Sequence, residues 1–249
     1  MSFGSGTIGR VIGAFLNALG ILLGALLGLA GRNPLSPRTQ SQMKTALGAL
    51  IAFCGLQLVW LNVAGNFTSV LKQLFLTGLA VVLGSLLGKI LGLQRFSNRL
   101  GRHAAALLAT GESETGRPAA GFIAAMILFC AAPLGILGAV TDGLTGYFFP
   151  LALKAVMDGL ATASFVKMFR WPMALAAVPV FLWFNGLATA VHAFALPWLE
   201  AHHLLPAVNA AAGLIICATA LVVLEVRRVE LANFLPALTI APLLWHYLV

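Results

Sequence analysis

Charged residues are scarce in this 249-residue chain: they make up 9% of it, and only seven are acidic. A water-soluble domain usually carries about a quarter charged residues, so a soluble globular protein is excluded. Hydrophobic residues make up 60%, in apolar runs of about 20 residues, which is enough to cross roughly 30 Å of hydrocarbon. The runs are continuous rather than alternating, which argues against a β-barrel. The sequence therefore predicts an all-α, polytopic transmembrane helical bundle.

Cysteine and histidine are scarce as well, which bears on enzyme and metal chemistry. Cys54, Cys130 and Cys217 each fall within an apolar run and lack metal-ligand spacing, so we expect small packing residues rather than ligands or disulfide partners. No combination of the five histidines has zinc-site spacing. The aspartates lack the strings typical of intramembrane aspartyl proteases, and no nucleophile–base arrangement is recognisable. The sequence therefore predicts no enzyme activity, no metal and no cofactor. A membrane enzyme ranks third, after the two classes of function given below.

Eight apolar runs are long enough to span a bilayer, and no stretch between them could form a separate folded domain. We predict a single integral-membrane domain over residues 1–249, with a retained first helix, because Arg10 precedes an apolar run without a convincing signal-peptide cleavage site. The last run contains Pro236 and Pro242 and could instead re-enter the membrane, leaving seven spans. The predicted spans are residues 7–29, 42–61, 71–91, 119–140, 148–168, 173–196, 207–225 and 231–248.

Basic residues lie between the apolar runs, on alternate connections. Twelve Lys and Arg fall on one side of the membrane and two on the other. Cytoplasmic connections carry the excess of basic residues, so both termini are predicted to lie outside, and the net charge of +8 does not indicate nucleic acid. Residues 93–118 are expected to form a cytoplasmic basic and polar loop. Its Arg95, Arg99 and Arg102 would attract the anionic headgroups of the lipid bilayer.

The first and third predicted spans look related. At an offset of 60 residues, residues 17–29 and 77–89 share a Leu-Leu-Gly pattern, which fits a parallel internal repeat of a two-helix unit, and many transporter folds contain internal repeats. Both spans also carry glycines four residues apart, which let helix backbones approach closely. Packing within the bundle is the favoured explanation, and a homodimer seam is the alternative. These glycines are Gly20, Gly24 and Gly28, and Gly84, Gly88 and Gly92.

Charges in the middle of the membrane are the strongest functional signal. Asp142 closes one apolar run, and Lys154 and Asp158 lie inside the next. An ionised side chain near the bilayer centre costs between about 3 and about 17 kcal/mol, and such residues usually face a bundle interior or a water-filled pathway. Lys154 and Asp158 are four residues apart, so on a helix they share a face and can pair. The alternative is a buried ion pair that serves only helix packing.

Further polar residues near the predicted span centres could contribute to such a site. Asn17 and Asn185 lie there, and the six-residue string that begins at Asp158 nearly repeats from Asn185. Hydrogen bonding between helices is the simpler explanation for each asparagine. Pro133 interrupts the fourth span and frees a backbone carbonyl. Transporters use such broken helices near the midplane to bind substrates and ions.

Five strings follow one another in order along most of the chain: residues 17–29, 128–130, 135–146, 154–158 and 233–238. Together they resemble the bacterial membrane-protein family known as domain-of-unknown-function family 554. Two departures from the family pattern are Lys89 and Tyr147, which stand where the family tends to have acidic residues. The resemblance implies an inner-membrane protein, usually guessed to be a transporter, and supplies no established substrate.

These observations lead to one preferred function and one alternative. We expect a transporter or channel for a small solute or ion, in the cell (inner) membrane, with Asp158, Lys154, Asp142, Asn185 and Asn17 as candidate binding residues. Asp158 is the best candidate to bind a cation or carry a proton, and Lys154 would neutralise it at rest or hold an anionic group. The alternative is a membrane scaffold or interaction protein whose ion pair is only structural.

Overall fold

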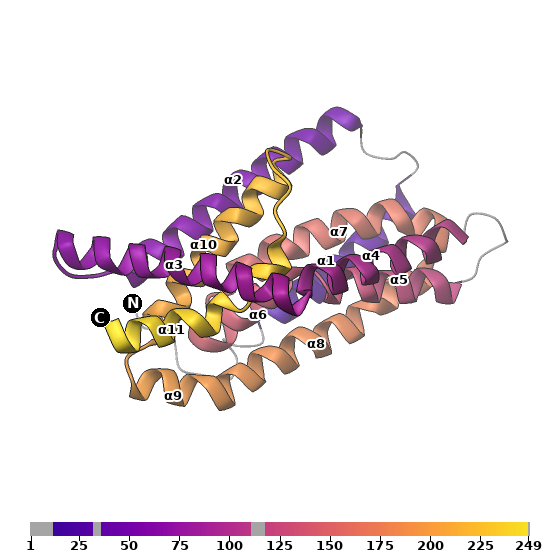
Figure 1. Ribbon diagram of the computed structural model, residues 1–249. Coiled ribbons are helices and arrows are strands. Elements are labelled where there is room, and N and C mark those ends of the chain that lie inside the picture. Colours follow the sequence, from indigo (N-terminus) through magenta and orange to yellow (C-terminus); the bar gives the residue numbers. More distant parts are fainter. Residues whose placement is uncertain (1–11, 32–35, 111–117, 249) are drawn as a thin grey trace. The chain divides into compact units, whose positions relative to one another are not determined.

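The computed structural model describes residues 12–31, 36–110 and 118–248, in which every regular element is a helix (Figure 1). The predicted all-α fold is confirmed, whereas the prediction made for Arg10 lies outside the described residues. The helices are α1 (Ile12–Ala30), α2 (Pro37–Asn62), α3 (Phe67–Leu91), α4 (Leu93–Thr110), α5 (Pro118–Cys130), α6 (Pro133–Thr145), α7 (Phe149–Phe169), η1 (Trp171–Ala176), α8 (Ala177–Ala190), η2 (Val191–Ala195), α9 (Leu196–Ala201), α10 (Leu205–Val223), η3 (Leu231–Phe234) and α11 (Ala237–Leu248).

Seven stretches of helix among the described residues are long and apolar enough to cross a membrane. They are α1, α2, α3, α7, the continuous stretch Trp171–Ala201, α10, and Leu231–Leu248, which joins η3 to α11. The helices α5 and α6 form a further pair that passes the same test together and is bent by 57° at a short break. Each predicted span thus corresponds to a helix, a broken helix or a bent pair.

Pro133 explains why the fourth predicted span is broken. Proline has no N–H group and disfavours helical backbone in the residue before it. Ala132 accordingly has an extended backbone, with φ −66° and ψ 123°. The helix α6 then begins with Pro133 in its first turn, where the missing N–H group costs nothing. The interruption expected from the sequence is therefore present, and it divides the span into two helices.

The contacts within the chain fall into two compact units, each built from two separate stretches. Unit 1 comprises residues 1–39 and 96–189, and unit 2 comprises residues 40–95 and 190–249. Unit 1 therefore contains α1, most of α4 and α5 to α8, whereas unit 2 contains most of α2, then α3 and α9 to α11. The candidate residues named above all belong to unit 1.

In unit 1, α1 and α7 lie side by side with small residues between them (Figure 1). A Cβ atom on Gly20 would overlap the backbone of Ala155, one on Gly24 would overlap that of Gly159, and Gly28 meets α7 one turn further on. The residue numbers rise together on both helices, so α1 and α7 run in the same direction. Parallel spans must be separated by an odd number of crossings. Because α2 and α3 supply two, the α5–α6 pair crosses the membrane once, which gives eight spans.

In unit 2, α3 uses the same kind of glycine face against different partners. A Cβ atom on Gly84 would overlap Ala237 of α11, and one on Gly88 would overlap the backbone of Asn233 in η3. From Gly84 to Gly88 the residue numbers rise, while those of the contacted residues fall from 237 to 233. The helices α3 and α11 are therefore antiparallel, as the third and eighth of eight spans must be. Gly92 instead caps α3 in the left-handed conformation, with φ 68°. The glycine faces of α1 and α3 are thus occupied within the chain, which favours the packing interpretation over a homodimer seam.

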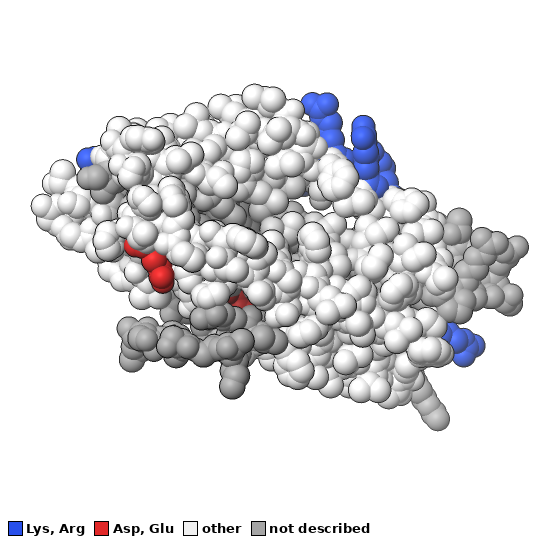
Figure 2. All heavy atoms as spheres, turned by 90° about the horizontal axis from the view of Figure 1, so that it is seen from below, with Lys and Arg blue, Asp and Glu red and all other residues white. Residues whose placement is uncertain are grey.

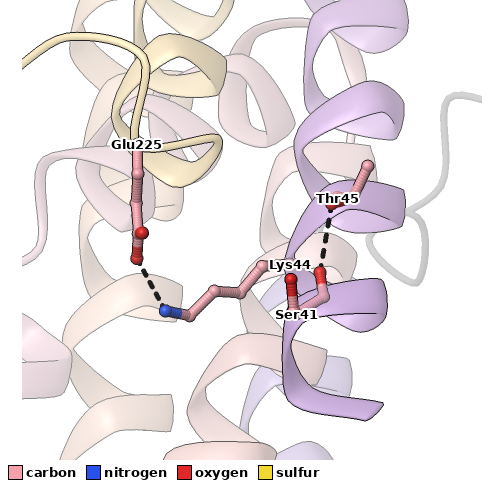
Figure 3. A network of polar contacts seen from close by, with 4 residues as sticks. All are labelled: Ser41, Lys44, Thr45 and Glu225. Atoms are coloured by element: carbon pink, nitrogen blue, oxygen red, sulfur yellow. Dashed lines mark hydrogen bonds and ion pairs between the residues drawn. The ribbon is translucent and has the colours of Figure 1, made fainter. Parts of the chain in front are cut away.

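Polar contacts join α2 and α10 of unit 2 at both ends. The Lys44 Nζ and Glu225 Oε1 atoms lie 2.7 Å apart, near the start of α2 and just after the end of α10 (Figure 3). At the other end, the Asn209 amide donates a hydrogen bond to Asn62 Oδ1 at 3.1 Å. The helices are therefore antiparallel, and the two connections predicted to be cytoplasmic lie at the same end of this pair.

The segment after α3 corrects one expectation, because Leu93–Thr110 is a helix rather than an irregular loop. Its apolar positions recur with helical spacing but form no continuous run, so a search for membrane-length runs does not reveal the helix. Ala104 is buried, whereas Arg95, Arg99 and Arg102 are exposed along one stripe of α4. The cytoplasmic position of this segment remains a prediction, and residues 111–117 lie outside the described residues.

Large apolar side chains are exposed on helices of both units. In unit 2, Trp60, Ile90 and Phe194 are 78%, 81% and 84% exposed, and in unit 1, Leu26 and Leu27 are 63% and 70% exposed. In the space-filling view most of the visible surface carries no charge, and Lys and Arg form small groups near its margin (Figure 2). Such a surface would be unfavourable in water and is typical of helices that face lipid.

Candidate functional site

Lys154 and Asp158 form a buried ion pair in the middle of α7. They are one turn apart, and the Lys154 ammonium donates a hydrogen bond to Asp158 Oδ2. Only 2% of the Lys154 side chain and 10% of the Asp158 side chain are exposed. Asp158 is about midway along α7, so the pair lies far from both helix ends. The pairing expected from the four-residue spacing is therefore present in unit 1.

Two phenylalanine rings enclose the ammonium. The Lys154 Nζ atom lies 5.6 Å from the centroid of the Phe129 ring and 5.4 Å from that of Phe184. Both distances are within the range in which an aromatic face attracts a cation. Phe129 is near the end of α5 and Phe184 is on α8, so three helices surround this charge. Nothing in the sequence distinguishes Phe184 from the other phenylalanines, of which the chain has 16 in all.

Asn17 adds an unsatisfied amide to the site. The residue is fully buried on α1, and its side chain lies close enough to Asp158 to act on the carboxylate. Neither its nitrogen nor its oxygen meets hydrogen-bond geometry with any partner in the described part of the chain. Leaving a buried polar group unpaired costs about 1–3 kcal/mol. The Asn17 side chain acts on the Asp158 carboxylate as a hydrogen-bonding group, so interhelical bonding accounts for part of its polar capacity and leaves the Oδ1 atom without a partner among the described residues.

The break between α5 and α6 lies beside the ion pair. A Cβ atom on Gly135, in the first turn of α6, would come within 2.7 Å of Lys154 Cε. Cys130, the last residue of α5, is close enough to interact electrostatically with both charges. The carbonyl groups in the last turn of a helix lack helical partners. The structure thus brings together a broken span, a buried ion pair and an unpaired amide.

Asp142 belongs to α6, and its side chain contacts the start of α1 rather than the ion pair. Its Oδ2 atom accepts a hydrogen bond from the Gly13 N–H at 3.2 Å, and its Oδ1 atom has no partner among the described residues. Gly13 and Asn17 are four residues apart on α1, so they lie on one face, separated by about 6 Å along the helix axis. Asp142 and Asn17 therefore lie on the same side of α1, about 6 Å apart along its axis, and the ion pair lies beside Asn17.

Asn185 does not join the pair. It lies on α8 and is only partly buried, and it is the preceding residue, Phe184, whose ring faces the ammonium. The similar strings that begin at Asp158 and Asn185 therefore do not reflect similar surroundings. Lys89 lies in the last turn of α3 in unit 2, where a cation suits the helix C-terminus, and Tyr147 follows the glycine cap of α6.

The site offers oxygen and aromatic groups rather than a transition-metal centre. Among the described residues there is no group of three or more His, Cys, Asp or Glu side chains that could hold a metal ion. Cys54, Cys130 and Cys217 form no disulfide bond among the described residues. An ammonium, a carboxylate and an amide are groups that bind small ions or polar solutes by charge and hydrogen bonds.

The fold and this site define a class: a multi-pass α-helical membrane protein with a charged pair beside a broken span. Comparisons with known proteins identify the family. The profile of a family described as protein of unknown function (DUF554) matches residues 12–246, and the chain belongs to this family.

Two relatives from bacteria match nearly the whole chain. The uncharacterized protein YqgA of Escherichia coli (strain K12) is 28% identical over 233 residues, which cover 93% of this chain and 94% of the relative. The uncharacterized membrane protein YdfK of Bacillus subtilis (strain 168) is 25% identical over 235 residues, with the same coverage. No solved structure gives a significant match. The family resemblance noted from the sequence is therefore confirmed.

Proposed function

We propose that this protein is a carrier for a small solute or ion, and that Lys154 and Asp158 form the centre of its binding site. The observation that supports this most is the fully buried Asn17 side chain beside the ion pair, whose Oδ1 atom has no partner among the described residues. A site built only for packing would pair such an amide or replace it with an apolar residue, because its burial costs free energy. A binding site leaves hydrogen-bonding capacity for a ligand.

The burial of the pair favours a carrier over a channel. Both charged side chains are almost completely enclosed, so this conformation contains no continuous water path through them. A carrier moves its ligand by opening a buried site to one side and then to the other. The break at Ala132 and the close glycine contacts between α1 and α7 are positions at which helices can tilt or slide.

The competing function is that of a membrane scaffold. The same burial of Lys154 and Asp158 supports it, since an ion pair sealed from water can hold helices in register. A scaffold has no use for an unpaired amide beside the pair, however, and this asymmetry favours the carrier. The relatives are bacterial, and we further propose the inner membrane as the location and transport rather than enzyme chemistry as the activity.

Flux through liposomes tests the proposal. Purified protein is reconstituted, and uptake of a panel of radiolabelled alkali ions, halide, phosphate, amino acids and organic acids is measured. We expect at least one flux that falls at least tenfold in Asp158→Asn. Glu225→Gln serves as the matched control, since it makes the same acid-to-amide change at an exposed position, and it should transport as the wild type does. Equal fluxes in wild type and Asp158→Asn for every solute would favour the scaffold.

A further inference from the structure

We propose that the ligand is a monovalent cation, and that it exchanges for the proton of the Lys154 ammonium. This inference rests on the proposed carrier function and adds the class of substrate. In the structure Asp158 already holds one positive charge, that of Lys154. A free cation of the same charge can take the place of the ammonium beside Asp158, provided that Lys154 gives up its positive charge by losing a proton.

The immediate neighbours of the ammonium suit a cation and not an anion. The faces of Phe129 and Phe184 present negative π density to it. Most of the first turn of α6 is not available to an anion, because Pro133 has no N–H group and Gly135 and Ile136 both donate to the Ala132 carbonyl. The C-terminal end of α5, which has the negative end of the helix dipole, lies beside the pair at Cys130.

The oxygen atoms near the pair indicate that the cation carries a single positive charge. Asn17 Oδ1 is fully buried, has no partner and lies near the Asp158 carboxylate. Carboxylate and amide oxygens are the ligands that hard cations prefer. Asp158 is the one carboxylate at the pair in the described chain, because Asp142 is engaged at Gly13. One carboxylate neutralises one positive charge, so a divalent ion would leave a buried charge uncompensated.

The exchange follows from the cost of two like charges at one carboxylate. In the low dielectric of the bundle interior, an entering cation and the ammonium repel each other strongly. The Lys154 ammonium therefore releases one proton to water as the cation binds Asp158, leaving a neutral amine and an unchanged net charge. The side chains that face the pair are Asn17 from α1, Phe129 and Cys130 from α5, and Phe184 from α8; α6 contributes Gly135. Of these only the Cys130 thiol titrates, and a neutral thiol leaves the balance unaltered.

Calorimetry on the purified wild-type protein tests the exchange directly. Sodium, potassium or lithium chloride is titrated into the protein in two buffers of equal pH but different heats of ionisation. The dependence of the binding heat on the buffer gives the number of protons released. We expect saturable binding of at least one of the three cations, with close to one proton released per cation. Binding without proton release, or no binding of any of the three, would overturn the inference.

Variants and vesicles separate this inference from the carrier proposal. Lys154→Arg keeps the positive charge but cannot release its proton, so it should lose cation binding, and Glu225→Gln should retain it. In vesicles with a trapped pH dye, an inward gradient of the bound cation should raise the internal pH. An Asp158-dependent flux of a different solute, without this pH change, would contradict the cation–proton exchange but would still support the carrier function. Absence of any Asp158-dependent flux would contradict both. If the variants fail to fold, the proton count of the wild type still decides.

Discussion

The two units use the same packing device but bury different kinds of polar group. In each unit a helix with a glycine face, α1 or α3, packs against small residues of a later span. Unit 1 then buries full charges in the middle of α7, beside an unpaired amide. The buried amides of unit 2 lie near helix ends and each makes at least one hydrogen bond: Asn209 donates to Asn62, although its own Oδ1 atom has no partner among the described residues, and Asn233 bonds the Gln94 N–H and Glu230.

This difference separates polar groups that support the fold from those that do not. Amides near helix ends satisfy backbone groups or join neighbouring helices, which is a structural role. A charge pair midway along a span satisfies no backbone group and costs desolvation energy that a pair of apolar residues would avoid. The polar groups of unit 1 therefore call for a functional explanation, whereas those of unit 2 are explained by the fold.

The largest expected effect is that of breaking the ion pair. Lys154→Met leaves Asp158 unpaired in the interior, which should destabilise the protein by about 3–5 kcal/mol. Asp158→Asn should also be costly, and the double variant should recover part of the loss, because no lone charge is left. The free energy of unfolding in detergent measures this. Additive losses in the double variant would show that the two charges do not stabilise each other.

The glycine faces should respond alike in both units. Gly24→Ala and Gly84→Ala place a methyl group against the backbone of a neighbouring helix, and overpacking of this kind costs about 1–3 kcal/mol. Gly186→Ala is the matched control, because a Cβ atom there meets nothing within 4 Å, and the higher helix propensity of alanine should leave stability unchanged or slightly raised. Thermal unfolding in detergent compares the three. A loss of stability for Gly24→Ala no larger than that for Gly186→Ala would show that α1 and α7 are not in close contact at Gly24.

These contrasts also show what the sequence could and could not reveal. Hydropathy predicts the spans because lipid demands continuous apolar length, and helical spacing predicts the pair of Lys154 and Asp158. The partner of α1 is not predictable in this way, since lipid-facing and buried positions are both apolar. Phe184 escapes notice for the same reason. The helix α4 is missed because an amphipathic stripe lacks a continuous apolar run.

Replacing an asparagine by leucine, which has a similar shape, should have opposite effects in the two units. Asn233→Leu removes amide atoms that accept from the Gln94 N–H and donate to Glu230, which should cost about 1–3 kcal/mol. Asn17→Leu removes an amide that has no partner, so stability should stay equal or rise by about 1 kcal/mol while flux falls. The free energy of unfolding in detergent and the flux into liposomes together measure these effects on stability and on transport. An Asn17→Leu variant that is destabilised as strongly as Asn233→Leu would indicate a structural amide.

The smallest effect is expected at the exposed pair of Lys44 and Glu225. The hydrogen bond from Lys44 lowers the pKa of the Glu225 carboxyl below its usual value of 4.5. A lowered pKa in the folded state means that any stabilisation is present above the unfolded pKa and is lost as the pH falls through the folded value. Solvent screens this pair, so Glu225→Gln should leave the unfolding curve unchanged between pH 5 and pH 7. A clear loss of stability at pH 7 would show that the connection contributes more than an exposed pair normally does.

The central claim is that the enclosed pair in unit 1 becomes reachable from water, and labelling at Asn17 tests it most directly. In protein that lacks the three native cysteines, Asn17→Cys is exposed to a small charged thiol reagent in reconstituted vesicles. Thr68→Cys, exposed in the first turn of α3, controls for reagent activity, and Val156→Cys, on the exposed face of α7, controls for reaction within lipid. We predict that Asn17→Cys reacts, more slowly than Thr68→Cys, while Val156→Cys does not. An unreactive Asn17→Cys beside a reactive Thr68→Cys would contradict the carrier and leave the ion pair as a structural element.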